Sequence, residues 1–263
     1  MGLATSPAQL NLTLASLFSD RSRYHALRIY ADDLIIATTD WHTHLQQFEL
    51  ALRTLQKASL SCNPRKLEVG FSETEFLGFV ISGDSRRISS KRIEAIKNIK
   101  PPKNQKALQR TLGLLNYFRA FIPWFSSKTY KMRQLLRKDM VYKWTPKCDA
   151  ELEYLKDCLV REPILRTLDP NCDIIVATDG SKYGLGWAIL QQDDDGRVYA
   201  VSYGAKATTP TQSNYPADDF EAIALVYALK SIEPMAISRR IIHTTDNSHL
   251  LHLHTWKPVN ARQ

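Results

Sequence analysis

The sequence predicts an α+β N-terminal part followed by an α/β C-terminal part. Up to about residue 165, short apolar and β-branched segments are interspersed with amphipathic helical patterns, and after a linker at 167–171 the pattern becomes three strands, a helix and a fourth strand. Of the 263 residues, 44% are hydrophobic and 24% are charged, which excludes wholesale disorder. The longest apolar run, 222–229, is too short to span a membrane, so we expect no membrane partner.

A helix, a β-hairpin and a second helix are expected first. Serine followed by proline at the start of the first helix is typical of a cap and a first helical position. The hairpin is predicted by two apolar segments that flank a pair of acidic residues. Apolar residues of the second helix step by 4, 3, 4 and 3, which predicts an amphipathic face. These elements are expected at 6–18, at 27–30 with 34–37, and at 41–55.

Two strand-like segments and a series of helices follow. The strands are expected around Leu67–Phe71 and Phe76–Ile81, and Gly83-Asp84 is typical of a turn after them. Apolar residues three or four apart then mark three helices, with Asn104 as the cap of the second. These helices are expected over 93–99, 108–118 and 152–159.

The C-terminal part begins with a different kind of strand. Ile174-Ile175-Val176-Ala177 is continuously apolar, which is typical of a strand buried on both faces. Two more strands, a helix between Pro216 and Pro234, and a last strand follow it. They are expected at 184–190, 198–203, 217–232 and 240–244.

Positive charge is concentrated in one segment. The chain carries +8 overall, but Arg86–Lys147 contains 17 Lys or Arg and two acidic residues, a local net charge of +15. Because these side chains neutralise phosphates, the segment predicts a nucleic-acid partner, with a solvated helical face as the alternative. The four cysteines form no C-x-x-C pair, so we expect neither a disulfide framework nor a zinc site, and a cytoplasmic or nuclear location.

Two acidic residues are expected at the tip of the first hairpin. In Tyr30-Ala31-Asp32-Asp33, a turn lets both carboxylates reach one site, whereas neighbours in a straight strand point to opposite faces. Paired carboxylates repel one another, and a divalent cation relieves that repulsion. The motif therefore predicts a metal site at Asp32 and Asp33, with a polar surface turn as the alternative.

Three more acidic residues follow the C-terminal pattern. Asp179 comes after the apolar strand, Glu221 lies in the helix, and Asp246 follows the fourth strand. Strand ends beside a helix bring side chains toward one point of an α/β sheet, although each acid alone is as typical of a cap or a solvated position. Four histidines lie within twelve residues around Asp246: His243, His249, His252 and His254. Their spacing is compatible with a metal site or with an ordinary helix that has no metal.

In these motifs the sequence resembles reverse transcriptases of gypsy-like long-terminal-repeat retrotransposons. Tyr30-Ala31-Asp32-Asp33 is similar to the palm active site of that family, and Phe76-Leu77-Gly78-Phe79 is similar to its primer-contacting hairpin. Leu112–Arg119 with Phe121-Ile122-Pro123 resembles the thumb. Three segments resemble metal-binding motifs of the ribonuclease H domain: Ala177–Ser181, Phe220–Ala222 and Thr244–Asn247.

The resemblance implies a partial reverse-transcriptase palm with thumb and connection, followed by an incomplete ribonuclease H-like domain. The implied ranges are 1–85 for the palm, 86–168 for the basic thumb and connection, and 169–263 for the C-terminally truncated ribonuclease H-like domain. The implied chemistry is RNA-directed DNA synthesis and cleavage of RNA–DNA hybrids by two-metal phosphoryl transfer, with Mg²⁺ or Mn²⁺ as cofactor. The implied catalytic metal ligands are Asp32, Asp33, Asp179, Glu221 and Asp246, and the implied nucleic-acid contacts are Tyr30, Leu77, Gly78, Lys106, Arg110, Tyr117 and Arg119.

Two acids of the family pattern have no counterpart in this sequence. A third polymerase aspartate belongs upstream of the segment at which the chain begins, and a fourth ribonuclease H acid belongs beyond Gln263. We therefore expect no DNA synthesis by this chain alone and only residual cleavage. The alternatives are a non-catalytic nucleic-acid-binding remnant of a retrotransposon polyprotein and a gene fragment without a stable fold. The sequence leaves the oligomeric state open.

Overall fold

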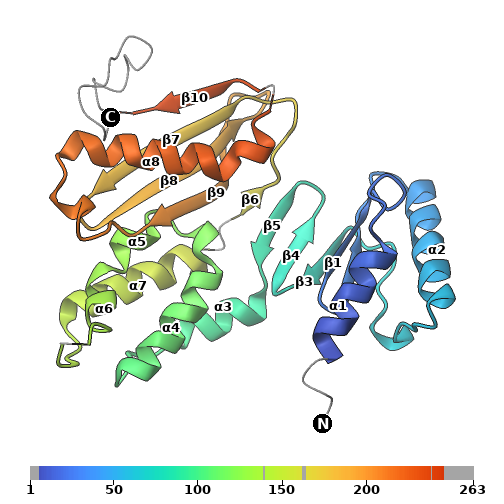
Figure 1. Ribbon diagram of the computed structural model, residues 1–263, viewed down its shortest axis with the longest axis horizontal. Helices are drawn as coiled ribbons and strands as arrows, with labels where there is room; N and C mark the ends of the chain where they lie inside the picture. The colour runs from blue at the N-terminus through green and yellow to red at the C-terminus, as the bar shows by residue number, and fades with distance from the viewer. Residues whose placement is uncertain (1–5, 139, 162–163, 238, 246–263) are drawn as a thin grey trace. The chain divides into compact units, whose positions relative to one another are not determined.

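The computed structural model describes residues 6–138, 140–161, 164–237 and 239–245. The chain divides into two compact units, one made of 1–77 with 81–83 and the other of 78–80 with 84–263 (Figure 1). Among the helices of the described residues, none combines the length and apolar character needed to cross a membrane.

The first unit is built around the predicted hairpin. Its two strands pair antiparallel with Leu27 opposite Ile36 and Tyr30 opposite Asp33. Helices on either side of the hairpin in sequence pack against it, and their shared core includes Phe18, Tyr24 and Leu55. The elements are α1 (Ser6–Leu17), β1 (Leu27–Tyr30), β2 (Asp33–Ile36), α2 (Trp41–Lys57) and the 3₁₀ turn η1 (Pro64–Lys66).

The strands after α2 differ from the sequence prediction. Residues 67–71 form no strand, and the predicted strand Phe76–Ile81 is divided by a turn at Leu77 and Gly78, whose φ angles are +55° and +77°. A strand at Ser85–Ile88 was not predicted, because its sequence Ser-Arg-Arg-Ile has no apolar run. The strands, neighbours in this order in one sheet, are β3 (Glu73–Phe76), β4 (Phe79–Ser82), β5 (Ser85–Ile88) and β6 (Leu165–Arg166).

The second unit contains the three predicted helices around its largest core. Leu108, Leu115 and Phe118 of the second helix are buried against Leu152 and Leu155 of the third. Two short helices between them were not predicted, because one turn has no recognisable period. The helices are α3 (Ser90–Lys97), α4 (Gln105–Tyr117), η2 (Arg119–Phe121), α5 (Phe125–Lys128), α6 (Tyr130–Gln134) and α7 (Pro146–Val160).

A four-stranded sheet completes the second unit and confirms the order of elements expected from the sequence. Its strands lie in the order β10-β7-β8-β9, with β10 parallel to β7 and the other pairs antiparallel. Ile174 and Val176 of β7 pack against Leu225 and Ala228 of the long helix on one face. The elements are β7 (Ile174–Ser181), β8 (Gly184–Gln192), β9 (Val198–Lys206), η3 (Gln212–Asn214), α8 (Ala217–Ile232), η4 (Glu233–Met235) and β10 (Ile241–Thr244).

Candidate functional site

The paired aspartates lie at the tip of the β1–β2 hairpin. Ala31 and Asp32 form a two-residue turn in which Ala31 has a φ of +53°, and Asp33 opens β2 opposite Tyr30. Tyr30, Asp32 and Asp33 are all exposed. The turn thus presents two consecutive carboxylates to solvent, which are hard oxygen ligands of the kind that Mg²⁺ prefers.

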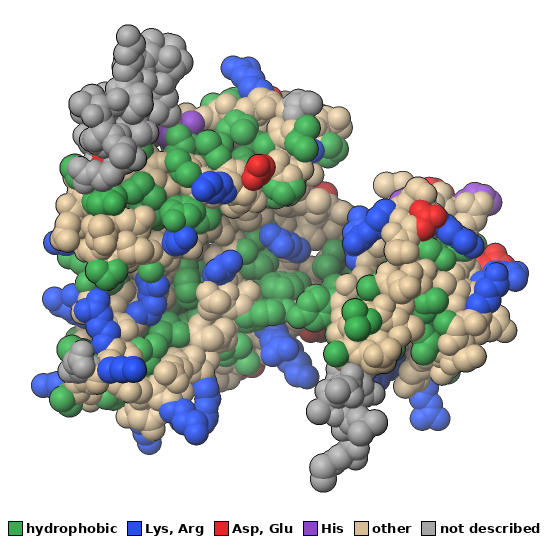
Figure 2. Space-filling model, in the orientation of Figure 1, with side chains coloured by type: hydrophobic (Ala, Val, Ile, Leu, Met, Phe, Trp, Pro, Cys, Tyr) green, Lys and Arg blue, Asp and Glu red, His purple; other side chains and the backbone are tan. Residues whose placement is uncertain are grey.

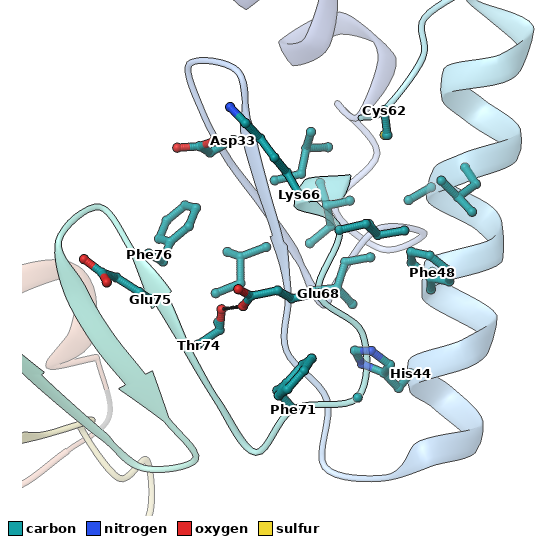
Figure 3. A pocket seen from close by; sticks show the side chains of 18 of the residues that line it. Asp33, His44, Phe48, Cys62, Lys66, Glu68, Phe71, Thr74, Glu75 and Phe76 are labelled. Carbon is teal, nitrogen blue, oxygen red and sulfur yellow. Dashed lines mark hydrogen bonds between the residues drawn. The ribbon is translucent and has the colours of Figure 1, made fainter. Parts of the chain in front are cut away.

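A cavity of about 300 Å³ lies behind this hairpin within the first unit (Figure 3). Apolar side chains of β2 and α2 line it, including Phe48 and Leu52, and Asp33 and Lys66 contribute charges. Lys66 extends toward the hairpin tip (Figure 3). The sequence patterns did not single out Lys66, which is the last residue of the 3₁₀ turn η1 that Asn63 caps.

A second acidic site is centred on the junction of β7 and α8. A Cβ on Gly180 would lie 2.6 Å from the carbonyl oxygen of Phe220, so strand and helix touch at a position that only glycine permits. Asp179 and Glu221 are the chain neighbours of these two residues. The structure therefore brings the segments that carry the two predicted acids into contact, with Asp179 exposed and Glu221 only 8% exposed.

Residues of β10 and its following segment support this junction. The Thr245 hydroxyl donates to Glu221 Oε1 at 3.3 Å. His243 Nε2 and Thr178 Oγ1 are hydrogen-bonded at 2.8 Å, and burial lowers the pKa of His243. These contacts fix both the strand next to Asp179 and the carboxylate of Glu221.

The full acidic set extends past the residues that the structure describes. Asp246 lies outside them, as do His249, His252 and His254. Within the described residues, no three His, Cys, Asp or Glu side chains are grouped closely enough to hold a metal ion. Asp179 and Glu221 nevertheless fit a divalent cation in donor chemistry, because both offer carboxylate oxygens beside a backbone junction that leaves no room for another side chain.

The predicted nucleic-acid contacts of the second unit lie on the exposed side of α4 and in η2. Lys106, Arg110, Tyr117 and Arg119 are all exposed, and the Tyr117 ring stacks on Phe79 with centroids 5.5 Å apart. Lys and Arg side chains gather over α4 and α6 on the face seen in Figure 2. Leu77 and Gly78, also predicted contacts, form the turn between β3 and β4.

Protein-family models match both regions of the chain that contain the acidic residues. Residues 1–81 match the reverse transcriptase (RNA-dependent DNA polymerase) family model, and residues 144–243 match the model of the RNase H-like domain found in reverse transcriptase. The Transposon Tf2-3 and Tf2-7 polyproteins of Schizosaccharomyces pombe are each 32% identical to the chain over 244 residues. The chain belongs to the reverse transcriptase and ribonuclease H family of long-terminal-repeat retrotransposons. The alignment with the Tf2 polyproteins covers 90% of this retrotransposon chain but spans only 18% of their length.

Solved structures show that this retrotransposon chain shares its fold with a viral reverse transcriptase. The foamy viral protease-reverse transcriptase in complex with RNA/DNA hybrid has a TM-score of 0.75 and 23% identity, covering all of this chain and 36% of that one. The complex of the foamy viral protein with dsDNA gives the same TM-score and identity, covering 98% of this chain and 53% of that one. The predicted mixture of α+β and α/β architecture is therefore confirmed.

Proposed function

We propose that this chain acts on RNA–DNA hybrids, cleaving the RNA strand at the β7–α8 junction and contributing palm residues to RNA-directed DNA synthesis. The observation that carries the proposal is the contact of Gly180 with Phe220, which joins the segments of Asp179 and Glu221. It is supported by the foamy viral structure, which was determined in complex with RNA/DNA hybrid.

The side chains at the β7–α8 junction would bind the catalytic metal ions and keep their carboxylate ligands in position. Asp179, Glu221 and Asp246 would hold divalent cations, with Mg²⁺ or Mn²⁺ matching their oxygen donors. When bound, such a metal pair supplies activation of water and stabilisation of the leaving oxygen. Thr245 would keep one oxygen of Glu221 in place through its 3.3 Å hydrogen bond.

The carboxylates of the β1–β2 hairpin in the first unit would likewise bind a metal ion, here for polymerisation. Asp32 and Asp33 would hold the metal near the primer end, and Tyr30 would contact the nucleic acid from the adjacent position. Leu77 and Gly78 would contact the primer, while the α4 residues Lys106, Arg110 and Tyr117, together with Arg119 of η2, would hold the duplex. Two exposed carboxylates at the end of a rigid two-residue turn suit this role.

Glu221→Gln tests the cleavage proposal. The substitution keeps the size of the side chain but removes its charge. Because loss of a residue that merely supports a metal ligand costs about 10–100-fold, we expect Mg²⁺-dependent cleavage of a labelled RNA–DNA hybrid to fall by at least about 100-fold. Glu233→Gln, an exposed glutamate after α8, makes the same charge change away from the junction and should cleave like the unmodified chain. Equal cleavage by both variants would refute the assignment of Glu221.

A second candidate function is binding of hybrids without cleavage. The net charge of +15 over Arg86–Lys147 favours it independently of the acidic site. Salt-sensitive hybrid binding by the full chain with no cleavage in Mg²⁺ or Mn²⁺ would select this function over the enzymatic one.

A further inference from the structure

Two tyrosines and two lysines form a cluster at the end of the sheet that carries Asp179. Lys182 and Tyr183 make the turn between β7 and β8, and Tyr130 and Lys131 begin α6. The rings of Tyr130 and Tyr183 meet with centroids 4.6 Å apart and planes at 55°. We name these four residues the tyrosine–lysine patch.

Each ring of the patch lies beside an ammonium group. Lys182 Nζ is 5.3 Å from the centroid of Tyr183, and Lys131 Nζ is 5.4 Å from that of Tyr130. Both lysines are exposed, and 40% of the Tyr183 surface is exposed. The patch thus combines free positive charge with an accessible aromatic ring, the two features that bind a nucleic-acid strand through its phosphates and bases.

Backbone contacts hold the patch in place before any ligand arrives. A Cβ on Gly184 would lie 2.9 Å from the Ser127 backbone nitrogen, so the β7–β8 turn rests directly on α5. The Lys182 carbonyl accepts a hydrogen bond of 2.7 Å from Thr208 Oγ1. A preorganised surface of this kind loses little conformational freedom on binding.

The second half of the patch is fixed by a partly buried carboxylate. Glu151 of α7 accepts hydrogen bonds from the backbone N–H groups of Lys131 and Met132, at 2.8 and 2.9 Å. Burial raises the pKa of Glu151, while these backbone hydrogen bonds and the charges of Arg133 and Lys131 lower it, so the carboxylate lies within electrostatic reach of one patch lysine.

The position of the patch relates it to Asp179. Asp179 pairs across the ladder with Gly186, which lies against Trp124 just before α5, so Asp179 and the patch lie on the same side of the sheet. Lys182 follows Asp179 by three residues, in the turn directly after β7, so the patch begins close to the end of the strand that carries Asp179.

From this arrangement we infer that the tyrosine–lysine patch binds the sugar-phosphate backbone and a base or sugar of one hybrid strand, next to the site that carries Asp179. The inference rests on the proposed function, since it places the hybrid at the β7–α8 junction. It assigns a nucleic-acid contact to Tyr130, Lys131, Lys182 and Tyr183, separate from the α4 residues.

Hybrid binding in the presence of EDTA tests the patch without requiring cleavage. The full chain, Lys131→Ala/Lys182→Ala and the control Lys206→Ala/Lys230→Ala are titrated against a fluorescein-labelled RNA–DNA hybrid at several NaCl concentrations. The control removes two exposed lysines, one of which also lies over an aromatic ring, with Lys206 Nζ 3.9 Å from the Tyr227 centroid. We expect the patch variant alone to bind more weakly, with a slope of log Kd against log salt reduced by about 1.8 for two lost phosphate contacts.

A second pair of variants isolates the aromatic contact. Tyr183→Ala should raise the Kd at least about five-fold, because it removes the ring on which one base stacks. Tyr183→Phe keeps the ring, so its Kd should stay within about two-fold of that of the unmodified chain. Patch and control variants that bind equally, with hybrid binding otherwise intact, would overturn the inference while leaving the proposed function standing. Failure of the unmodified chain to bind hybrid at all would overturn both.

Discussion

Gly180 shows how one residue decides whether the acidic site forms. The Cβ of an alanine there would lie 2.6 Å from the Phe220 oxygen and 2.7 Å from its carbonyl carbon, and backbone atoms do not move aside as a flexible side chain does. The contact is therefore a requirement of the β7–α8 junction that carries Asp179 and Glu221.

We expect Gly180→Ala to lower the free energy of unfolding by about 1–3 kcal/mol through overpacking and to reduce hybrid cleavage as α8 shifts. Urea denaturation and the cleavage assay measure the two effects. Gly113→Ala is the matched control, since nothing lies within 4 Å of a Cβ there and Gly113 is inside α4. Replacing glycine by alanine inside a helix should raise the free energy of unfolding by about 0.5–1 kcal/mol. A lower free energy of unfolding for both variants would therefore contradict the steric argument.

His243 makes stability depend on pH. Burial lowers the pKa of His243 below its usual 6.5 in the folded chain. The unfolded chain therefore takes up a proton at this side chain first as the pH falls, and stability present above about pH 6.5 is lost through the window below it. We expect a lower urea midpoint at pH 5.5 than at pH 7.5, and a smaller difference for His243→Asn. His42→Asn, at an exposed position on α2, should leave the difference unchanged.

At the scale of elements, α3 and α4 begin with caps of different kinds. Asn104 Oδ1 accepts from the Ala107 N–H at 2.9 Å, whereas the Ser89 hydroxyl is buried and has no hydrogen-bond partner within the described part of the chain. Asn104→Ala should cost about 1 kcal/mol of unfolding free energy. Ser89→Ala removes an unsatisfied polar group and should be neutral or stabilising. Urea denaturation measures both variants. If Ser89→Ala lowers the free energy of unfolding as much as Asn104→Ala does, the Ser89 hydroxyl has a role in capping.

The observed helices matched the ranges predicted from the sequence more closely than the observed strands did. Helix α8 occupies the predicted range 217–232, because Pro216 and Pro234 mark its two ends. The expected strand at 67–71 was wrong, because this segment is irregular and its apolar residues Leu67 and Phe71 are 44% and 69% exposed. On α2, the period identified only part of the buried face. Of the apolar residues expected on that face, Leu55 is buried, whereas Trp41 and Leu45 are 57% and 43% exposed.

At the scale of the whole molecule, charge is divided along the chain. Arg86–Lys147 carries +15 while the rest of the chain carries −7. A hybrid bound by the basic segment releases counterions, so its affinity falls steeply with salt.

We expect the Kd of the full chain for a hybrid to rise at least about ten-fold between about 50 and 200 mM NaCl. Lys106→Glu/Arg110→Glu on α4 should weaken binding and flatten this salt dependence, as measured by fluorescence anisotropy. Lys206→Glu/Lys230→Glu reverses two positive charges outside the basic segment. It should change the affinity and its salt dependence much less. Salt-independent binding would exclude the basic segment as the contact surface.

The candidate site was predictable wherever a short motif carries it. Tyr30-Ala31-Asp32-Asp33 indicated a hairpin with an acidic tip because turn and motif coincide within a few residues. The contact of Thr245 with Glu221 was not predictable, since the two residues are 24 positions apart and the rest of α8 and strand β10 lie between them. Lys66 was likewise missed, because only the folded unit brings it to the cavity that Asp33 lines.

Sequence patterns were enough to predict the helices with a clear period, the strands with continuous apolar runs, the acidic motifs and the concentration of positive charge. These depend on neighbouring residues, whose spacing along the chain fixes local hydrogen bonding and burial. The contacts of Gly180 with Phe220 and of Tyr130 with Tyr183 follow instead from the folded arrangement, since they arise from packing between elements far apart in sequence. Local patterns carry no information about which distant faces fit together, and that fit depends on side-chain volumes across a whole core.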